Sequence, residues 1–199
     1  MSGARIGDES AAERNKKPIF DALAPWLRQA KSLLEVGAGD ATHALYAGER
    51  LPQLAWQTSE APAHHRRLVA ALADRHETRL APPLALDVRH AWPDVTYDAV
   101  YGANVAHIMD WAAVEALFAG AASHLSTAGL LCLYGPFKRP GENLAPGNRE
   151  FDAALRARDP AMGLRAVDAL DALATSGHMR RVADIAMPSN NRLLIWQRD

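Results

Sequence analysis

The chain alternates short apolar segments with segments of helical periodicity, and this alternation limits the folds it can adopt. Five apolar segments read as buried strands, at residues 32–38, 54–60, 84–88, 97–104 and 130–137. Helical patterns lie at residues 16–30, ahead of the first strand, and at 41–51, 61–76 and 111–126, between strands. Parallel strands need crossovers of this kind, and such crossovers are right-handed. We therefore expect an α/β protein with a mostly parallel sheet and helices on both faces.

The two ends of the chain have different patterns. In the helix at 16–30 we expect Pro18 in the first turn and Pro25 at a kink or break, and residues 1–12 read as flexible. Two short helices are expected within 147–177, divided around Asp159–Pro160. Two strands within 179–199 then join at a polar turn, which predicts an antiparallel strand at one edge of the sheet. The 199 residues suit a single domain.

The amino-acid composition limits the kinds of binding partner and metal site that we expect. The formal net charge of −1 gives no general attraction to nucleic acid or to acidic membranes, so we expect neither as a partner. Cys132 is the only cysteine, which excludes an intrachain disulfide and a cysteine-built metal site, and we expect no metal. No segment reads as a membrane span, and the polar N-terminal sequence lacks the apolar core of a signal peptide. We therefore expect a cytoplasmic protein.

Two glycines stand where the first strand turns toward a helix. Gly37 and Gly39 follow Glu35, and ligands of parallel sheets bind at the carboxyl ends of the strands. Glycine lets the backbone turn tightly and approach a ligand without a Cβ in the way. Thr42 stands where the third glycine of a dinucleotide fingerprint would fall, and a lone Gly-x-Gly also occurs in ordinary tight turns.

Acidic residues at the next two strand ends add to this signal. Glu60 ends the second strand at a spacing suited to ribose hydroxyls, and Asp87 ends the third, where it can accept from an adenine amino group. Either acid alone also suits a helix cap. Together with the glycines they favour an adenosine-containing ligand. The sequence has no GxxxxGK[ST], so S-adenosylmethionine, which has no phosphate, fits better than a nucleoside triphosphate.

These segments resemble the class I S-adenosylmethionine-dependent methyltransferases. The first motif is "LLEVGAGDATHA", the acidic second-strand end is "QTSE", and the third-strand end is "LALDV". From about Ser10 to the end, "AAERNKKPI", "NVAHIMDW", "LYGPFKRPGE" and "AMPSNNRLLIW" resemble the methyltransferase-like protein 26 family.

The resemblance implies a Rossmann-like, mostly parallel seven-stranded sheet that binds S-adenosylmethionine and releases S-adenosylhomocysteine. It also implies that residues 1–30 form a flexible segment and a lid helix over the donor. We expect the donor to be bound by Arg14, Asn15, Glu35, Gly37, Ala38, Gly39, His43, Glu60, Asp87, Val88 and Asn104. Arg14 and Asn15 would contact its carboxylate.

Three residues near the fourth and fifth strand ends are candidates for catalysis. His107 is the best candidate base, Asn104 can orient a nucleophile, and Tyr134 can hydrogen-bond the substrate or face the sulfonium. Each residue type also suits a packing role at such a position. A base is needed only where the nucleophile must lose a proton.

The sequence leaves several functions open. "GANVAH" stands after the fourth strand in place of an "NPPY"-like motif, so the expected acceptor is a small molecule with an oxygen, nitrogen or sulfur nucleophile. One alternative is a non-catalytic S-adenosylmethionine-binding regulatory protein. Another is an NAD-dependent oxidoreductase, which the missing third glycine disfavours. The sequence does not predict an oligomeric state.

Overall fold

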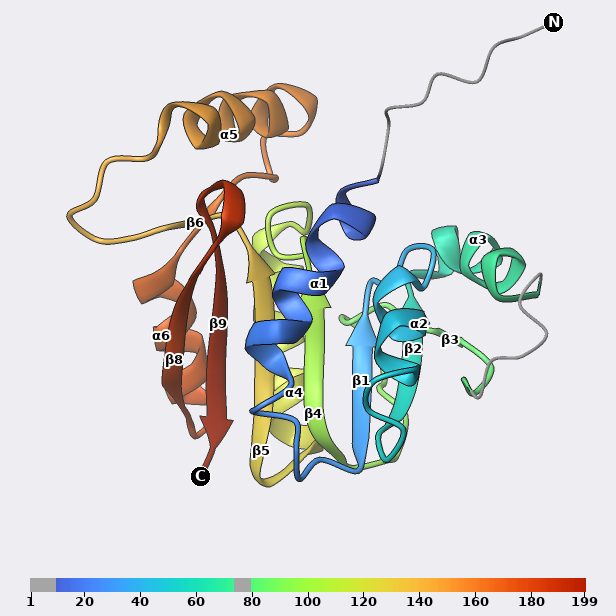
Figure 1. The fold of residues 1–199 in the computed structure, drawn as a ribbon. Coiled ribbons are helices and arrows are strands. Elements are labelled where there is room, and N and C mark those ends of the chain that lie inside the picture. Colours follow the sequence, from blue (N-terminus) through green and yellow to red (C-terminus); the bar gives the residue numbers. More distant parts are fainter. Residues whose placement is uncertain (1–9, 74–79) are drawn as a thin grey trace, which may run out of the picture.

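The computed structural model describes residues 10–73 and 80–199 (Figure 1). Seven strands form one sheet in the order β3–β2–β1–β4–β5–β9–β8. Their bounds are β1 Ser32–Val36, β2 Ala55–Glu60, β3 Leu84–Ala85, β4 Tyr97–Ala103, β5 Leu125–Gly135, β8 Met179–Met187 and β9 Asn191–Arg198. Strands β1 to β5 pair in parallel, whereas β9 runs antiparallel to both β5 and β8. The expected α/β class and antiparallel C-terminal strand are confirmed.

Helices cover both faces of the sheet, as expected. Their bounds are α1 Ala11–Leu23, α2 Thr42–Gly48, α3 Pro62–Ala73, α4 Trp111–His124, α5 Pro146–Arg158 and α6 Val167–Ser176. One core joins α1 and α2 to inward side chains of the central strands, with Phe20, Leu33 and Tyr101 among its members. A second core packs α4 and α6 on the opposite face, where the ring of Phe118 meets Trp196 edge-on at 5.2 Å. The central strand β1 is buried on both faces, which is why Leu33, Leu34 and Val36 are all apolar, with the buried Glu35 as the polar exception.

The carboxyl ends of the parallel strands lie together along one border of the sheet, perpendicular to the strands, which we call its carboxyl edge. Helix α5, the turn between β8 and β9, and the N-terminal end of α1 also reach this edge (Figure 1). The strand order reverses between β1 and β4, so the loops after these two strands meet here. In sheets of this topology the ligand crevice lies at such a reversal.

Some boundaries differ from the prediction. Helix α1 begins at Ala11, where we expected flexible residues, and it holds Pro18 in its interior instead of its first turn. Its cap is Ser10, whose hydroxyl accepts from the Glu13 N–H at 3.1 Å. The helix ends before Pro25, which has no N–H to continue it. The expectation for residues 1–9 lies outside the described residues.

Two strands also differ in length. Strand β5 begins at Leu125, where we expected helix, because Leu125 pairs with Tyr97 before an irregularity in the ladder. Strand β3 ends at Ala85 instead of continuing to Val88, because Asp87 turns the chain by accepting from the Arg89 N–H at 3.1 Å. A short parallel pair, β6 (Phe137–Lys138) with β7 (Arg165–Ala166), was not predicted.

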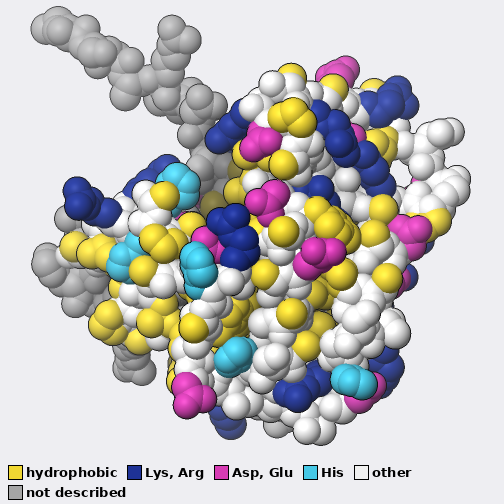
Figure 2. All heavy atoms as spheres, turned by 180° about the vertical axis from the view of Figure 1, so that it is seen from behind, with side chains coloured by type: hydrophobic (Ala, Val, Ile, Leu, Met, Phe, Trp, Pro, Cys, Tyr) yellow, Lys and Arg dark blue, Asp and Glu magenta, His cyan; other side chains and the backbone are white. Residues whose placement is uncertain are grey.

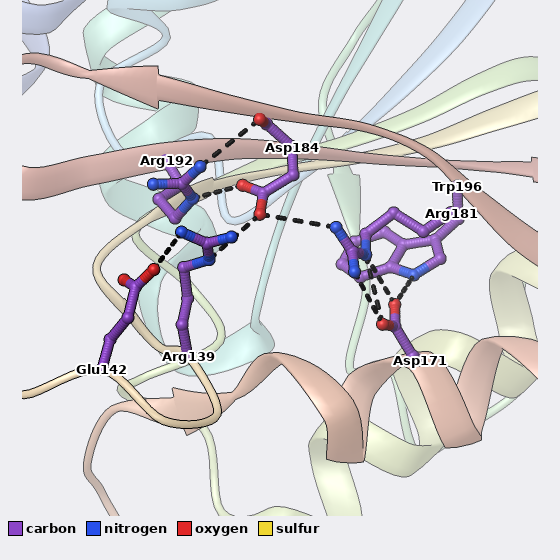
Figure 3. A network of polar contacts seen from close by, with 7 residues as sticks. All are labelled: Arg139, Glu142, Asp171, Arg181, Asp184, Arg192 and Trp196. Carbon is purple, nitrogen blue, oxygen red and sulfur yellow. Dashed lines mark hydrogen bonds and ion pairs between the residues drawn. The ribbon is translucent and has the colours of Figure 1, made fainter.

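A network of charged side chains ties the segment after β6 to the edge of the sheet (Figure 3). Asp184 on β8 lies near three arginines: Arg139 and Arg181, each at 3.4 Å, and Arg192. Arg139 comes from the segment between β6 and α5, and it also pairs with Glu142 there. This segment is therefore joined to β8 through one carboxylate.

Charges on the face that carries α4 and α6 are interspersed. Basic, acidic and hydrophobic side chains alternate there over short distances (Figure 2). Within the described residues, no helix has the length and hydropathy needed to cross a bilayer.

Candidate functional site

The glycine turn, residues 37–39, brings bare backbone to the end of β1. Gly37 and Gly39 have φ values of +72° and +62°, which non-glycine residues seldom adopt. A Cβ placed on Gly37 would lie 2.5 Å from Cγ1 of Val105, so the turn packs tightly against the β4–α4 loop. A Cβ on Gly39 would meet no atom within 4 Å. The backbone of Gly39 therefore borders open space, and Gly37 admits no side chain without movement of its neighbour.

Glu60 lies beside the glycine turn, as predicted from its place at the end of β2. Its carboxylate accepts from the Gly39 N–H and from the Ala61 N–H, each at 2.9 Å. The Ala38 N–H donates to the Ser59 carbonyl at 2.9 Å and so holds the turn against β2. A carboxylate has about four acceptor positions, so Glu60 can accept two further bonds from a diol.

Asp87 and Val88 lie at the end of the third strand, but both have partners in the protein. Asp87 accepts from the Arg89 side chain at 3.0 and 2.9 Å, and these bonds lower the pKa of Asp87 to about 2. Val88 is buried in the core on the α4 face, and its carbonyl accepts from Trp92 Nε1 at 3.1 Å. An adenine amino group would have to share the Asp87 carboxylate with Arg89.

Glu35 and His43 belong to a buried polar network beneath the glycine turn. Glu35, 1% exposed, accepts from Trp56 Nε1 at 2.8 Å. His43 Nε2 lies 2.8 Å from Asn15 Oδ1, and His43 Nδ1 lies 3.2 Å from the Tyr101 hydroxyl. With the amide oxygen of Asn15 as acceptor, His43 donates from Nε2, and its Nδ1 lies near both the Tyr101 hydroxyl and Glu35 Oε1, the latter at 3.8 Å. The network thus links α1 to the first turn of α2.

A cavity of about 460 Å³ lies between α1 and α5, at the carboxyl edge of the sheet. We call it the α1–α5 cavity. Five segments line it: α1, the β4–α4 loop, the end of β5 with Pro136, α5, and the turn between β8 and β9. Its volume lies within the range of sites that bind small molecules.

Five of the predicted site residues line this cavity: Arg14, Asn15, Asn104, His107 and Tyr134. The other predicted residues lie elsewhere. Gly37, Ala38, Gly39 and Glu60 form the neighbouring turn, Glu35 and His43 lie beneath it, and Asp87 and Val88 lie at the third strand end.

The β4–α4 loop connects the glycine turn to the cavity. Val105 packs on Gly37, while Asn104 and His107, on either side of it, line the cavity. Asn104 has φ of +59°, a conformation that asparagine tolerates better than most residues, and its N–H donates to the Tyr134 carbonyl at 2.8 Å. Sparsely populated backbone of this kind clusters at functional sites.

Tyr134 is a second link between the segments. It is buried, and the side chains of Asn191 and Asn15 hydrogen-bond to it. Burial raises the pKa of Tyr134, and these two hydrogen bonds oppose the rise. The phenol therefore stays protonated near neutral pH and joins α1 to β9 across the cavity wall.

His107 is the titratable group best placed for proton transfer. Its side chain is 6% exposed, and its ring meets Phe151 of α5 edge-on at 5.2 Å. Burial, with a smaller contribution from the nearby Arg165 charge, lowers the pKa of His107 from 6.5 to about 4. The imidazole is therefore neutral at pH 7 and has one ring nitrogen free of a proton.

This pKa shift predicts a pH-dependent stability. An unfolded histidine binds a proton as the pH falls below 6.5, whereas His107 in the folded protein stays neutral until about pH 4. Because the unfolded state binds more protons in this window, the free energy of unfolding falls as the pH drops from 6.5 to 4, by about 3 kcal/mol from this group. Urea unfolding at several pH values should show this fall in the wild type and a smaller one in His107→Gln. Parallel curves for the two proteins would contradict the assignment.

The sequence did not single out the cavity residues contributed by the last third of the chain. Asn148 and Phe151 come from α5, and Ser189 and Asn191 from the turn between β8 and β9. The turn between β8 and β9 was predicted from its polar composition. Its position beside the carboxyl ends of the parallel strands could not be predicted from neighbouring residues. The segment "AMPSNNRLLIW", which contains Ser189 and Asn191 and was part of the resemblance described above, was the available signal.

The site offers backbone, amides and one neutral imidazole, and no cluster of three or more metal-binding side chains occurs in the described part of the chain. The geometry suits an uncharged adenosyl group on the glycine turn and Glu60, beside a separate polar cavity.

Comparisons with known proteins bear on the fold and the family. A family model described as "Protein of unknown function (DUF938)" matches residues 8–198. The mitomycin 7-O-methyltransferase MmcR has a similar structure, with a TM-score of 0.80 and 16% identity over 94% of this chain and 55% of its own. Human N-acetylserotonin methyltransferase, solved with S-adenosylmethionine, gives a TM-score of 0.75 and 12% identity over 92% of this chain and 51% of its own.

A third similar structure is CalO1, a methyltransferase of calicheamicin biosynthesis, solved with S-adenosylhomocysteine. It has a TM-score of 0.75 and 14% identity over 95% of this chain and 54% of its own. The chain thus spans about half the length of these structures. At these identities the likeness shows the fold, which is the Rossmann-like fold of class I methyltransferases.

Proposed function

We propose that this chain, which belongs to the DUF938 family of proteins of unknown function, is an S-adenosylmethionine-dependent methyltransferase that acts on a small molecule. One observation carries the proposal. The β4–α4 loop packs on the glycine turn through Val105 and lines the α1–α5 cavity through Asn104 and His107. A donor on the turn and an acceptor in the cavity would therefore meet at a single loop.

The donor half of the site rests on the glycine turn and Glu60. Glu60 would accept from the ribose hydroxyls, Gly37 and Gly39 would present bare backbone, and Asp87 would share its carboxylate with the adenine amino group. Arg14 and Asn15 on α1 would lie near the methionine carboxylate. When bound, the donor supplies an electrophilic methyl group on a sulfonium. Two of the similar structures hold this donor or its product, which supports the choice.

The acceptor half rests on the cavity. Asn104 and Tyr134 would orient the acceptor by hydrogen bonds, and positioning of this kind lowers the barrier of a two-reactant step by several kcal/mol. The free ring nitrogen of His107 would accept the proton that an acceptor hydroxyl loses. An oxygen nucleophile fits this arrangement, and the structurally similar MmcR is an O-methyltransferase.

The proposal also covers the domain organisation, the location and the kinship of the chain. We propose that the chain is a single domain whose helix α1 covers the donor, that it works in the cytoplasm without nucleic acid or membrane partners, and that it is related to the methyltransferase-like protein 26 family. Segments shared with that family support the last point.

Donor titration tests the proposal. Binding of S-adenosylhomocysteine to the folded protein should raise its stability by about 2.7 kcal/mol at a hundred times the dissociation constant. Thermal unfolding should show the shift with S-adenosylmethionine and S-adenosylhomocysteine. NAD serves as the matched control and should give no shift, because the turn lacks a third glycine. A shift with NAD alone would favour an oxidoreductase, and donor binding without turnover of any acceptor would favour a regulatory protein.

A further inference from the structure

The α1–α5 cavity has a chemical character that limits its ligand. Among the described residues that line it none is acidic, and Arg14 is the one cation. Arg165 approaches from outside, where it donates to the Ala106 carbonyl at 3.0 Å, and its charge is felt at His107. Two acids flank Phe151 on α5: Asp152 accepts from Lys138 at 2.6 Å and pairs with Arg156 at 3.4 Å, and Glu150 is exposed and is not part of the lining. Among the described lining residues, a cationic ligand would therefore lose its hydration without gaining a counter-charge.

The apolar part of the lining consists largely of ring side chains. Pro18, Pro136 and Pro188 come from three different segments, and each adds a rigid ring. The ring of Phe151 lies beside His107 and is still 40% exposed, although it is a large apolar side chain at a cavity wall. A planar ligand would cover such surfaces and remove the Phe151 ring from water.

The polar part of the lining consists mainly of uncharged groups. Asn104, Asn148 and Asn191 contribute amides, which both donate and accept, whereas the amide of Asn15 is held by His43 and Tyr134. His107 adds a neutral imidazole that can accept from a hydroxyl. Groups of this kind recognise hydroxyl, carbonyl and carboxylate substituents, and none of them compensates a positive charge.

From this lining we infer that the acceptor is a planar phenol, uncharged or anionic, and that cationic amines are excluded. The inference rests on the proposed function and deepens it by naming the class of acceptor. Transfer forms a bond between the phenol oxygen and the methyl carbon and breaks the bond between that carbon and the donor sulfur. The phenol proton passes to His107 and from there to water, and the donor leaves as S-adenosylhomocysteine.

Three phenols that differ in charge test the inference. They are 4-ethylphenol, which is uncharged, 3-(4-hydroxyphenyl)propionate, which is anionic, and tyramine, which is cationic. With S-adenosylmethionine present, formation of S-adenosylhomocysteine by the full chain should give kcat/KM values at least tenfold higher for the first two than for tyramine. Equal or faster turnover of tyramine would overturn the inference.

A pair of matched variants tests the role of charge directly. Asn148→Asp places a carboxylate in the cavity at the first turn of α5, where the helix dipole favours an acid. It should shift the preference toward tyramine by at least tenfold. Asn143→Asp makes the same change outside the cavity and should leave the preference as it is in the wild type. Equal shifts in both variants would contradict a charge effect of the cavity itself.

Calorimetry with S-adenosylhomocysteine on the same preparation tests the donor site separately from the class of acceptor. Donor binding without turnover of any of the three phenols overturns the acceptor class and leaves the donor site standing. Absence of donor binding overturns the proposed function together with the inference.

Discussion

Replacement of Gly37 by alanine should weaken the binding of S-adenosylhomocysteine by at least tenfold and leave the protein folded. The left-handed backbone at Gly37 costs a side-chain-bearing residue about 1–2 kcal/mol, and relief of that strain would change the course of the turn. The added Cβ would also lie 2.5 Å from Cγ1 of Val105, which must then move. Because 1.4 kcal/mol corresponds to a factor of ten in affinity, we expect the two effects together to reach a tenfold loss.

Calorimetry on the purified variant measures this change, and Gly48→Ala is the matched control. Gly48 lies in α2 without a left-handed backbone, and a Cβ there meets no atom within 4 Å. That variant should bind the donor as the wild type does and be equally stable or slightly more stable, since alanine favours a helix. Wild-type affinity in Gly37→Ala would show that the donor does not use this turn.

Replacement of His107 by glutamine should reduce turnover by a factor of 10² to 10⁴, the usual contribution of a positioned acid or base. Glutamine keeps a hydrogen-bonding group of similar reach, but it cannot take up a proton. The affinity for S-adenosylhomocysteine should stay within twofold of the wild type, because the donor contacts proposed above do not include His107. Turnover of 4-ethylphenol and donor calorimetry together measure the two quantities.

The control for this variant is His64→Gln, the same change at an exposed position of α3. It should leave both turnover and donor affinity unchanged. Equal turnover in His107→Gln and the wild type would remove His107 from proton transfer, and the acceptor would then need no base. Loss of donor affinity in His107→Gln would instead place the residue in the donor half of the site.

Much of the fold follows from local patterns, because strand and helix periodicities are properties of neighbouring residues. The alternation that predicts β1 to β5 and the two C-terminal strands is of this kind. The early start of α1 also had a local signal, since Ser10 and Glu13 have the spacing of a capping box. Because the N-terminal sequence is polar and charged, we expected residues 1–12 to be flexible and not helical.

The candidate site was predictable only in part. Gly37, Gly39 and Glu60 meet because parallel strands end at one edge, which the topology dictates. Asn148 and Asn191 meet the β4–α4 loop only through long-range packing of α5 and of the turn after β8. Burial of Glu35 beside Trp56 has the same origin, because a strand pattern alone does not show which polar side chain finds an indole partner.

The ion pairs of Asp184 have a consequence for how the cavity exchanges its contents. Arg139 anchors the segment before α5 to β8, and Asp152 holds α5 itself by accepting from Lys138 and from the Leu164 N–H at 2.7 Å. The cavity wall formed by α5 is therefore held in place by two sets of contacts. On the opposite side of the cavity, Asn15 of α1 hydrogen-bonds to His43 and to Tyr134. Opening of the cavity on the α1 side would therefore require Asn15 to release both His43 and Tyr134.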